Sequence, residues 1–417
     1  MHKHLLFWFI AVAMATTAQA QYCTNNQRFS EVPFFTDDQI TTQSNIPYAT
    51  VINWTGASEV LRLDAYFPKL SADTMAKRPL ILMIHGGGLV SGDKINFTRV
   101  CREFARRGFV AVSIDYRLGL NCVADITSKE KAAYRAQQDA NAAFRFVVEN
   151  ADVLRIDTAW MFIGGGSAGA VTSLSLVYLS QAEWNAYAPA IPALLGNLNN
   201  SGNNLTHSYD IKGIFNNWGA MLSAFIEPEE MLPMVSFHGD DDSTVAVDST
   251  LGGGCLEDQP SYGSRTLHKI LVENGVCSDL SVKPGGEHGV YEDSIGTAFR
   301  VGRAACFFKS LFCNSCGSFY QTDSIPANCS QMASATQTPL NNAPTLVVTP
   351  NPFTNRIVLQ NATGMMPYRL FHTLGQLIDA GTALEQRDFS HLTPGVYLLV
   401  VETARGPQTF KLVKSEE

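Results

Sequence analysis

Met161-Phe162-Ile163-Gly164-Gly165-Gly166-Ser167-Ala168-Gly169-Ala170 is the stretch that decides the fold. The apolar run 159–163 before the glycines reads as a strand, and the apolar run 171–179 after them reads as a helix. The turn between them is so tight that small residues are needed two positions before and two after the serine. Gly165 and Gly169 meet that need. We therefore predict that Ser167 is a nucleophile held out above a sheet by a strand-to-helix turn.

Strands and helices alternate on both sides of this turn. Short, nearly continuous apolar runs such as 80–84 and 110–114 suit strands that are buried on both faces. Apolar residues at helical spacing predict helices at 128–150 and 261–275. Together they predict an eight-stranded, mostly parallel α/β sheet covered by helices on both faces. The expected strands are 49–54, 60–66, 79–84, 109–114, 159–163, 211–216, 233–237 and 279–283.

Length and composition favour an exported protein of two domains. The 417 residues exceed one typical domain, and 46% hydrophobic residues supply a large core. The formal net charge of −8 argues against a nucleic-acid partner. Residues 1–20 combine Lys3, an apolar run and Ala18-Gln19-Ala20, which predicts a signal peptide cut before Gln21. No later apolar stretch reaches the roughly 20 residues of a membrane-spanning helix, so we expect no transmembrane segment in the mature protein.

The chain has nine cysteines, which an oxidising compartment would convert to disulfides. Cys313 and Cys316 form a lone CxxC, without the further cysteines or histidines that a zinc site needs, and we interpret both as structural. An odd count leaves at least one thiol unpaired or intermolecular, and the sequence does not give the connectivity. The cysteines are at positions 23, 101, 122, 255, 277, 306, 313, 316 and 329.

The amino-acid composition of the chain changes near its C-terminus. Residues 317–344 are rich in Ser, Thr, Asn, Gln and Pro and read as a linker, so we place a catalytic α/β domain at 21–316. Beyond it, 345–417 contains short alternating segments separated by turn residues, which predict a small all-β domain. Its expected strands are 345–348, 356–359, 368–372, 376–379, 396–401 and 409–413.

A second glycine-rich turn, His85-Gly86-Gly87-Gly88, follows an earlier strand. Glycines here let backbone N–H groups approach a developing oxyanion, with one more N–H from Ala168. The turn lacks the GxGxxG and Lys-Ser/Thr patterns of phosphate loops. We interpret His85 as a structural hydrogen-bonding residue.

Candidate partners for Ser167 follow two later strands. An aspartate of the run 240–242 comes after the strand at 233–237, and His288 comes after the last strand. The order Ser, Asp, His is that of α/β-hydrolases. His288 would take the proton from Ser167 and return it to the leaving group, and the carboxylate would fix its tautomer. Calcium binding by the aspartate run is the competing interpretation.

These motifs resemble the α/β-hydrolase carboxylesterases related to hormone-sensitive lipase and to bacterial feruloyl- or acetyl-esterase-like enzymes, over roughly 45–312. The resemblance implies Asp242 as the triad acid, because HGxxDxxV fits 238–245 only there, and an oxyanion hole of Gly87, Gly88 and Ala168. It implies a small or polymer-linked ester substrate and neither metal nor organic cofactor. The stretch between Asp242 and His288 is longer than usual, and we expect 252–255 to form an extra loop tied through Cys255 to Cys277. The motifs are 85–88, 115–118, 165–169, 238–245 and 287–289.

The C-terminal motifs 350–353, 392–397 and 411–414 resemble the sorting domain of the Bacteroidetes type IX secretion system. The resemblance implies a β-sandwich that directs the protein through the periplasm and outer membrane, and so a secreted or cell-surface location. A carbohydrate-binding or immunoglobulin-like module is the competing interpretation.

Other polar residues carry weaker signals. Asn217 and Trp218 follow a strand and would line a substrate pocket, although a buried tryptophan is equally typical of a core. Asp139 reads as an ion-pair partner, and Asp115 and Arg117 as residues that shape a loop. A serine peptidase with the same triad, or a catalytically dead surface binding protein, are the competing functions. The preferred acid and alcohol and the oligomeric state do not follow from the sequence.

Overall fold

The computed structural model describes residues 21–24, 26–121, 123–125, 127–222, 225–251, 260–322, 346–361, 364–372, 376–403 and 406–415. The predicted signal peptide, most of the predicted linker and the loop at 252–255 lie outside the described residues, as do Cys122, Cys255 and Cys329.

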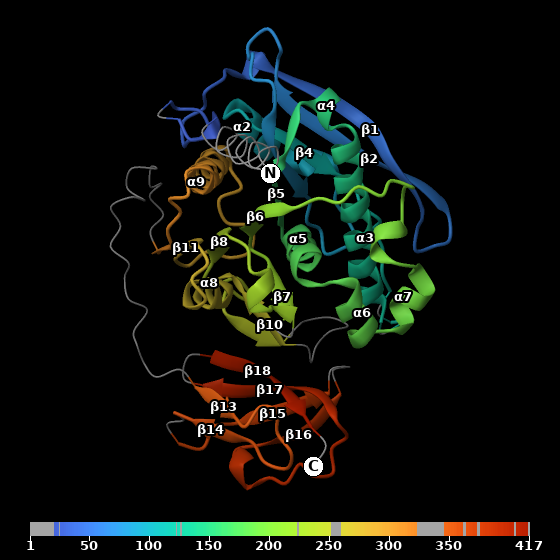
Figure 1. Ribbon diagram of the computed structural model, residues 1–417, viewed down its shortest axis with the longest axis vertical. Coiled ribbons are helices and arrows are strands. Elements are labelled where there is room, and N and C mark those ends of the chain that lie inside the picture. The colour runs from blue at the N-terminus through green and yellow to red at the C-terminus, as the bar shows by residue number, and fades with distance from the viewer. Residues whose placement is uncertain are drawn as a thin grey trace, which may run out of the picture.

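A nine-stranded sheet forms the centre of the larger domain, in the order β1-β2-β4-β3-β5-β6-β8-β11-β12 (Figure 1). β2 is antiparallel to β1 and β4, and every other neighbouring pair is parallel. All eight expected strands are present, which confirms the mostly parallel α/β class. The strands are β1 (Ile40–Ile52), β2 (Ser58–Pro68), β3 (Arg78–Ile84), β4 (Val110–Ile114), β5 (Ile156–Gly166), β6 (Ile211–Asn217), β8 (Met234–Gly239), β11 (Ser278–Lys283) and β12 (Phe319–Gln321).

Alternating residues of the central strands supply two separate cores. In β3, Leu80, Leu82 and Ile84 belong to one core and Ile81 and Met83 to the other, because successive strand residues point to opposite faces. Helices α3 and α5 cover the first core, and α2 and α9 pack together over the second (Figure 1). The helices are α2 (Thr98–Arg106), α3 (Ser128–Glu149), α4 (Ala151–Leu154), α5 (Ala168–Tyr178), α6 (Gln181–Tyr187), α7 (Ala190–Leu195), α8 (Ser264–Glu273) and α9 (Ser294–Phe312), with 3-10 turns η1 (Asp37–Gln39), η2 (Lys94–Phe97), η3 (Leu198–Asn200), η5 (Pro228–Glu230) and η7 (Leu384–Gln386).

Two disulfides tie the segment that follows α9 to the N-terminal part of the larger domain and to the start of β11. Cys23 pairs with Cys313, and Cys277 pairs with Cys316. The two cysteines of the CxxC therefore have different partners, which fits their interpretation as structural. The expected link between Cys255 and Cys277 is wrong, because β12 lies beside β11 and brings Cys316 within bonding distance of Cys277.

A small antiparallel sheet was not expected from the sequence. β7 (Ala220–Leu222), β10 (Pro260–Gly263) and β9 (Ser249–Leu251) pair in that order. Its strands β9 and β10 flank the loop in the long stretch between Asp242 and His288. Each strand is too short to give a clear periodic signal, so only tertiary pairing reveals it.

The C-terminal domain is a small β-sandwich with its own core (Figure 1). One sheet has the order β16-β15-β17-β18, and the other pairs β13 with β14. All six expected strands are present. They are β13 (Val347–Thr349), β14 (Val358–Gln360), β15 (Tyr368–His372), β16 (Leu377–Gly381), β17 (Gly395–Thr403) and β18 (Gly406–Lys414).

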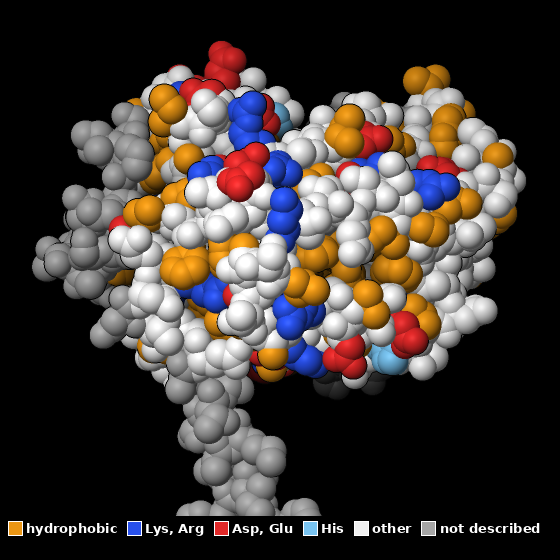
Figure 2. Space-filling model, turned by 90° about the horizontal axis from the view of Figure 1, so that it is seen from above, with side chains coloured by type: hydrophobic (Ala, Val, Ile, Leu, Met, Phe, Trp, Pro, Cys, Tyr) orange, Lys and Arg blue, Asp and Glu red, His pale blue; other side chains and the backbone are white. Residues whose placement is uncertain are grey.

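Polar contacts between described residues join the domains. The Tyr262 hydroxyl donates to the Thr409 carbonyl oxygen over 2.8 Å, and Lys411 forms an ion pair with Glu227. Seen from above, the molecule shows Lys and Arg side chains in a broken row with Asp and Glu beside them, so charges of both signs mix on this face (Figure 2). Within the described residues, no helix is both long and apolar enough to cross a membrane.

Candidate active site

Ser167 lies at a strained turn between β5 and α5. Its backbone has φ 52° and ψ −123°, a conformation that non-glycine residues rarely adopt outside functional sites. A Cβ at Gly165 would lie 2.3 Å from the Gly169 carbonyl carbon, and one at Gly169 would lie 2.0 Å from the Ile84 oxygen. Only glycine fits at either position, and the close backbone contacts around both glycines keep the turn in this conformation.

His288 hydrogen-bonds to both Ser167 and Asp242. Its Nε2 lies 2.9 Å from the Ser167 Oγ, and its Nδ1 lies 2.7 Å from the Asp242 Oδ2. Ser167 follows β5, Asp242 follows β8 and His288 follows β11. The strands β5, β8 and β11 lie close together in the sheet and run parallel, so their carboxyl ends meet at one edge. The arrangement provides a hydroxyl, a base and an orienting carboxylate in series.

Asp242 is buried in a shell of hydrogen-bond donors. Its Oδ1 accepts from the backbone N–H groups of Thr244 at 2.9 Å and Val245 at 2.8 Å. Its Oδ2 lies 3.2 Å from His238 Nε2 as well as next to His288. Burial raises the pKa of the Asp242 carboxyl, but hydrogen bonds from His238, Val245 and His288 outweigh burial and hold that pKa well below its usual range. The side chain is therefore a carboxylate.

The other two aspartates of the run point elsewhere. Asp240 and Asp241 are exposed, and Asp240 Oδ1 accepts the backbone N–H of Gly285 at 2.6 Å. No group of three or more metal-binding side chains occurs among the described residues. Asp242 alone of the three lies beside His288.

The turn after β3 lies against the Ser167 turn. Gly87 and Gly88 have φ values of 104° and 63°, and neither donates its N–H to a backbone group in the described turns and loops. Ala168 is the first residue of α5, so its N–H has no acceptor within the helix. A Cβ at the neighbouring Gly86 would lie 2.9 Å from the Gly166 oxygen, which shows how closely the two turns pack. Three N–H donors are thus available near the serine.

His85 has structural contacts. Its Nδ1 lies 2.8 Å from the Gly86 oxygen, and its ring stacks on Tyr116 with centroids 4.4 Å apart. The Tyr116 hydroxyl donates to the His85 carbonyl oxygen at 3.0 Å. This imidazole supports the glycine turn from behind.

A cavity of about 1210 Å³ opens beside Ser167 and His288. Trp218 lines it, and the indole ring meets His288 edge to face with centroids 6.2 Å apart. Asn217 does not line it. That side chain is fully buried, and its Nδ2 donates to the Gly165 oxygen at 2.7 Å beneath the serine turn. The structure thus separates two adjacent residues that the sequence suggested for the same pocket.

Arg300 is a cavity residue that sequence reasoning missed. It lies in α9, lines the cavity and is buried. Its Nη1 donates to the Asn217 Oδ1 at 2.6 Å. The apolar pattern of α9 marks position 300 only as an inward-facing residue, so no sequence signal identifies it.

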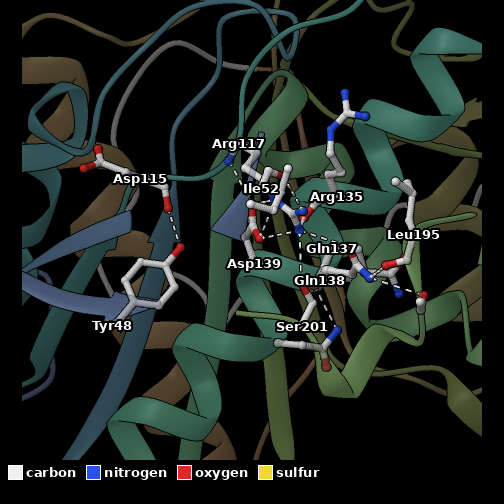
Figure 3. Close-up of polar contacts among 12 residues, drawn as sticks. Tyr48, Ile52, Asp115, Arg117, Arg135, Gln137, Gln138, Asp139, Leu195 and Ser201 are labelled. Atoms are coloured by element: carbon white, nitrogen blue, oxygen red, sulfur yellow. Dashed lines mark hydrogen bonds and ion pairs between the residues drawn. The ribbon is translucent and has the colours of Figure 1, made fainter. Parts of the chain in front are cut away.

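Asp139 and Arg117 form a buried ion pair (Figure 3). Arg117 Nη2 lies 2.7 Å from Asp139 Oδ1, and its backbone N–H donates to Oδ2 at 2.8 Å. Gln138 accepts from the same guanidinium at 2.9 Å. Asp115 accepts the Lys94 N–H at 3.0 Å and so holds the loop beside the glycine turn. These contacts agree with the structural roles expected for Asp115, Arg117 and Asp139.

Two family models match separate parts of the chain. Residues 63–222 match the family BD-FAE, and residues 347–415 match the secretion system C-terminal sorting domain. The resemblance to an esterase-type α/β-hydrolase domain followed by a type IX sorting domain is thereby confirmed.

Curated relatives match over a short range. Esterase LipI of Mycobacterium tuberculosis is 34% identical over 105 residues, which are 25% of this chain and 30% of the relative. The medium-chain fatty acyl-CoA hydrolase precursor of Anas platyrhynchos is 33% identical over 121 residues, 29% of this chain and 21% of the relative. The match therefore spans less than a third of either relative. A solved truncated carbohydrate esterase from gut microbiota is 18% identical with a TM-score of 0.46, covering 67% of this chain and 98% of its own.

Proposed function

We propose that this chain, an esterase-type α/β-hydrolase domain joined to a secretion sorting domain, is a secreted serine carboxylesterase that works through an acyl-enzyme. The observation that carries the proposal is the continuous hydrogen-bonded series from Ser167 through His288 to Asp242. This series ends at a serine in a strained turn that faces an open cavity.

Acylation begins at Ser167. His288 Nε2 accepts the hydroxyl proton as Oγ attacks the ester carbonyl carbon. The Asp242 carboxylate keeps the proton of His288 on Nδ1, so Nε2 is free to act as the base, and it stabilises the imidazolium that forms. Collapse of the tetrahedral intermediate expels the alcohol, which takes its proton from His288 Nε2.

The oxyanion of that intermediate needs donors that are in place before the reaction. We assign the backbone N–H groups of Gly87, Gly88 and Ala168 to this role. The Ala168 N–H also stands at the positive end of the α5 helix dipole, which favours negative charge. Preorganised donors of this kind stabilise the transition state more than the substrate.

Deacylation repeats the same chemistry with water. His288 removes a proton from the water that attacks the acyl-Ser167 carbonyl, and then returns it to the serine oxygen as the acid leaves. Each proton moves through one imidazole, so the cycle needs no other titrating group.

The C-terminal domain directs the protein through type IX secretion to the cell surface or the medium. Within the described residues, the cavity beside Ser167 is lined only by residues of the larger domain. Catalysis and sorting are therefore assigned to different domains, 21–316 and 345–417.

A fluorophosphonate probe tests the nucleophile directly. The mature protein should be labelled at Ser167, whereas the Ser167→Ala variant should not be labelled. Absence of labelling on the wild type would favour a catalytically dead binding protein. Release of p-nitrophenol from acetate and butyrate esters, compared with release of nitroaniline from aminoacyl anilides, separates an esterase from a serine peptidase.

A further inference from the structure

The cavity beside Ser167 contains a buried cation. Arg300 is 3% exposed and lines the cavity together with Ser167, His288 and Trp218. The guanidinium carbon lies over the Trp218 ring, 4.8 Å from its centroid, in a cation–π contact. Arg300 therefore packs against Trp218 at the cavity wall.

Two of the three guanidinium nitrogens have partners, and one does not. Nε donates to the Tyr291 carbonyl oxygen at 2.9 Å, and Nη1 donates to the Asn217 Oδ1 at 2.6 Å. Nη2 makes no hydrogen bond within the described chain, and it is not among the enclosed polar atoms that lack a partner. Nη2 is thus an unused donor on a residue that lines the cavity.

Arg300 also lacks a carboxylate partner among the described residues. Most other buried arginines of the larger domain have one at 2.5–2.7 Å, because burying an unpaired charge is costly. Glu292, which lines the same cavity but is exposed, and its neighbour Asp293 both attract the Arg300 charge, but neither carboxylate lies close enough to form an ion pair with it. The paired arginines are Arg28, Arg78, Arg107, Arg117 and Arg303.

Arg135 and Arg145 are buried without a carboxylate as well, but their setting differs. Each donates from Nη2 to a backbone carbonyl oxygen at 2.7 Å, of Gly119 and Ser201 respectively. Neither of them lines the cavity beside Ser167. Arg300 alone among these buried arginines lines the cavity beside Ser167, and its Nη2 has no hydrogen-bond partner within the described chain.

We propose that Arg300 binds a carboxylate carried by the ester substrate, so that the enzyme prefers esters with a free anionic group. A guanidinium forms charge-assisted hydrogen bonds with carboxylates, and these bonds are roughly twice as strong as those between neutral groups. The inference rests on the proposed esterase function and narrows it to one class of substrate.

The test compares pairs of methyl esters that differ in charge and hardly in shape. Monomethyl succinate, glutarate and adipate are each paired with the ester in which an amide replaces the free carboxylate. We expect the wild type to show a kcat/KM about ten- to hundredfold higher for the anionic member of at least one pair, the range of a charge-assisted hydrogen bond. Equal values for both members at all three lengths would overturn the proposal, while turnover of the neutral esters would still support the esterase function.

Variants assign the preference to Arg300. Arg300→Gln should bring the ratio of anionic to neutral kcat/KM close to one, and Arg300→Lys should retain part of it. Arg99→Gln is the matched control, because Arg99 is an exposed cation on the same cavity and its loss should leave the ratio in place. A ratio that survives in Arg300→Gln, or that falls equally in Arg99→Gln, contradicts the role of Arg300.

A binding measurement covers the case in which Arg300→Gln does not fold. Succinate should then inhibit wild-type hydrolysis of a neutral ester competitively and more strongly than succinamide does. Equal inhibition by the two compounds would contradict the proposal without any variant.

Discussion

Replacing Asp242 by asparagine should disable His288 as a base while leaving the fold intact. The Asp242 Oδ1 accepts two backbone N–H groups, from Thr244 and Val245. The asparagine oxygen would have to stay at that position to keep both bonds. Its NH2 group would then replace Oδ2 and face His288 Nδ1, which lies 2.7 Å away in the wild type.

An N–H group facing Nδ1 forces that nitrogen to act as an acceptor. The proton of the imidazole then moves to Nε2, which points at the Ser167 Oγ and can no longer accept its proton. In a serine protease triad the equivalent change lowers kcat about ten-thousandfold. A loss of that size corresponds to about 5 kcal/mol of transition-state stabilisation.

The assay is the steady-state turnover of p-nitrophenyl acetate by Asp242→Asn, with Asp240→Asn and Asp241→Asn as matched controls. Each control removes one negative charge from an exposed position in the turn that contains Asp242. We expect each to keep at least about a third of wild-type kcat. Circular dichroism should show the same fold for all three. A kcat within tenfold of wild type for Asp242→Asn, or an equally severe loss in either control, would refute the tautomer argument.

Four further changes test other parts of the structure. Ser167→Ala should lower turnover at least a thousandfold without changing the Tm, and retention of a tenth of the activity would exclude it as the nucleophile. Gly87→Ala places a Cβ 2.0 Å from the Ser91 oxygen and should lower kcat about a hundredfold, whereas an effect on KM alone would argue against an oxyanion role. Deletion of 345–417 should preserve esterase activity but leave the enzyme in the host periplasm, and equal extracellular amounts of deleted and full-length protein would contradict the sorting role. Burial lowers the pKa of His268 to about 4, below the value of about 6.5 expected in the unfolded chain. The unfolded state therefore binds more protons between these values, and stability falls as pH drops from about 6.5 to 4. In His268→Gln the Tm should fall less steeply than in the wild type over this pH range. An equally steep fall in Tm would show that other groups cause the loss of stability.

The sequence predicts the parts of this protein that depend on local sterics and on strand pattern. Gly165 is required by backbone contacts with Gly169 and Ala170, within a few residues of Ser167, so a motif reports it directly; Gly169 is required by the backbone at the end of β3, which the motif reports because this packing accompanies the turn. The expected strands appear because each buried strand needs its own apolar run. β12 was missed since its three residues are only partly buried and lie at the sheet edge.

Side-chain direction and long-range pairing do not follow from such patterns. Asn217 and Trp218 are neighbours in sequence, yet one turns under the serine and the other faces the cavity. The partner of Cys277 depends on how β12 docks on β11, and the exposure of Arg300 to the cavity depends on how α9 packs. Each of these is decided by contacts between segments far apart in the chain.

The HGxxDxxV segment shows how a local motif and a distant contact combine in one site. His238 Nε2 lies 2.8 Å from the Val245 carbonyl oxygen, which closes the turn that contains Asp242. A Cβ at Gly239 would lie 2.0 Å from the Gly286 oxygen, so only glycine lets the turn after β8 pack against the turn that carries His288. The histidine and the glycine of the motif therefore have separate tasks: one shapes the loop that holds the carboxylate, and the other brings that loop to the imidazole. The glycine acts only through its contact with the turn that follows β11. The motif therefore identifies Asp242 as the partner of His288 only in a fold that places β11 beside β8.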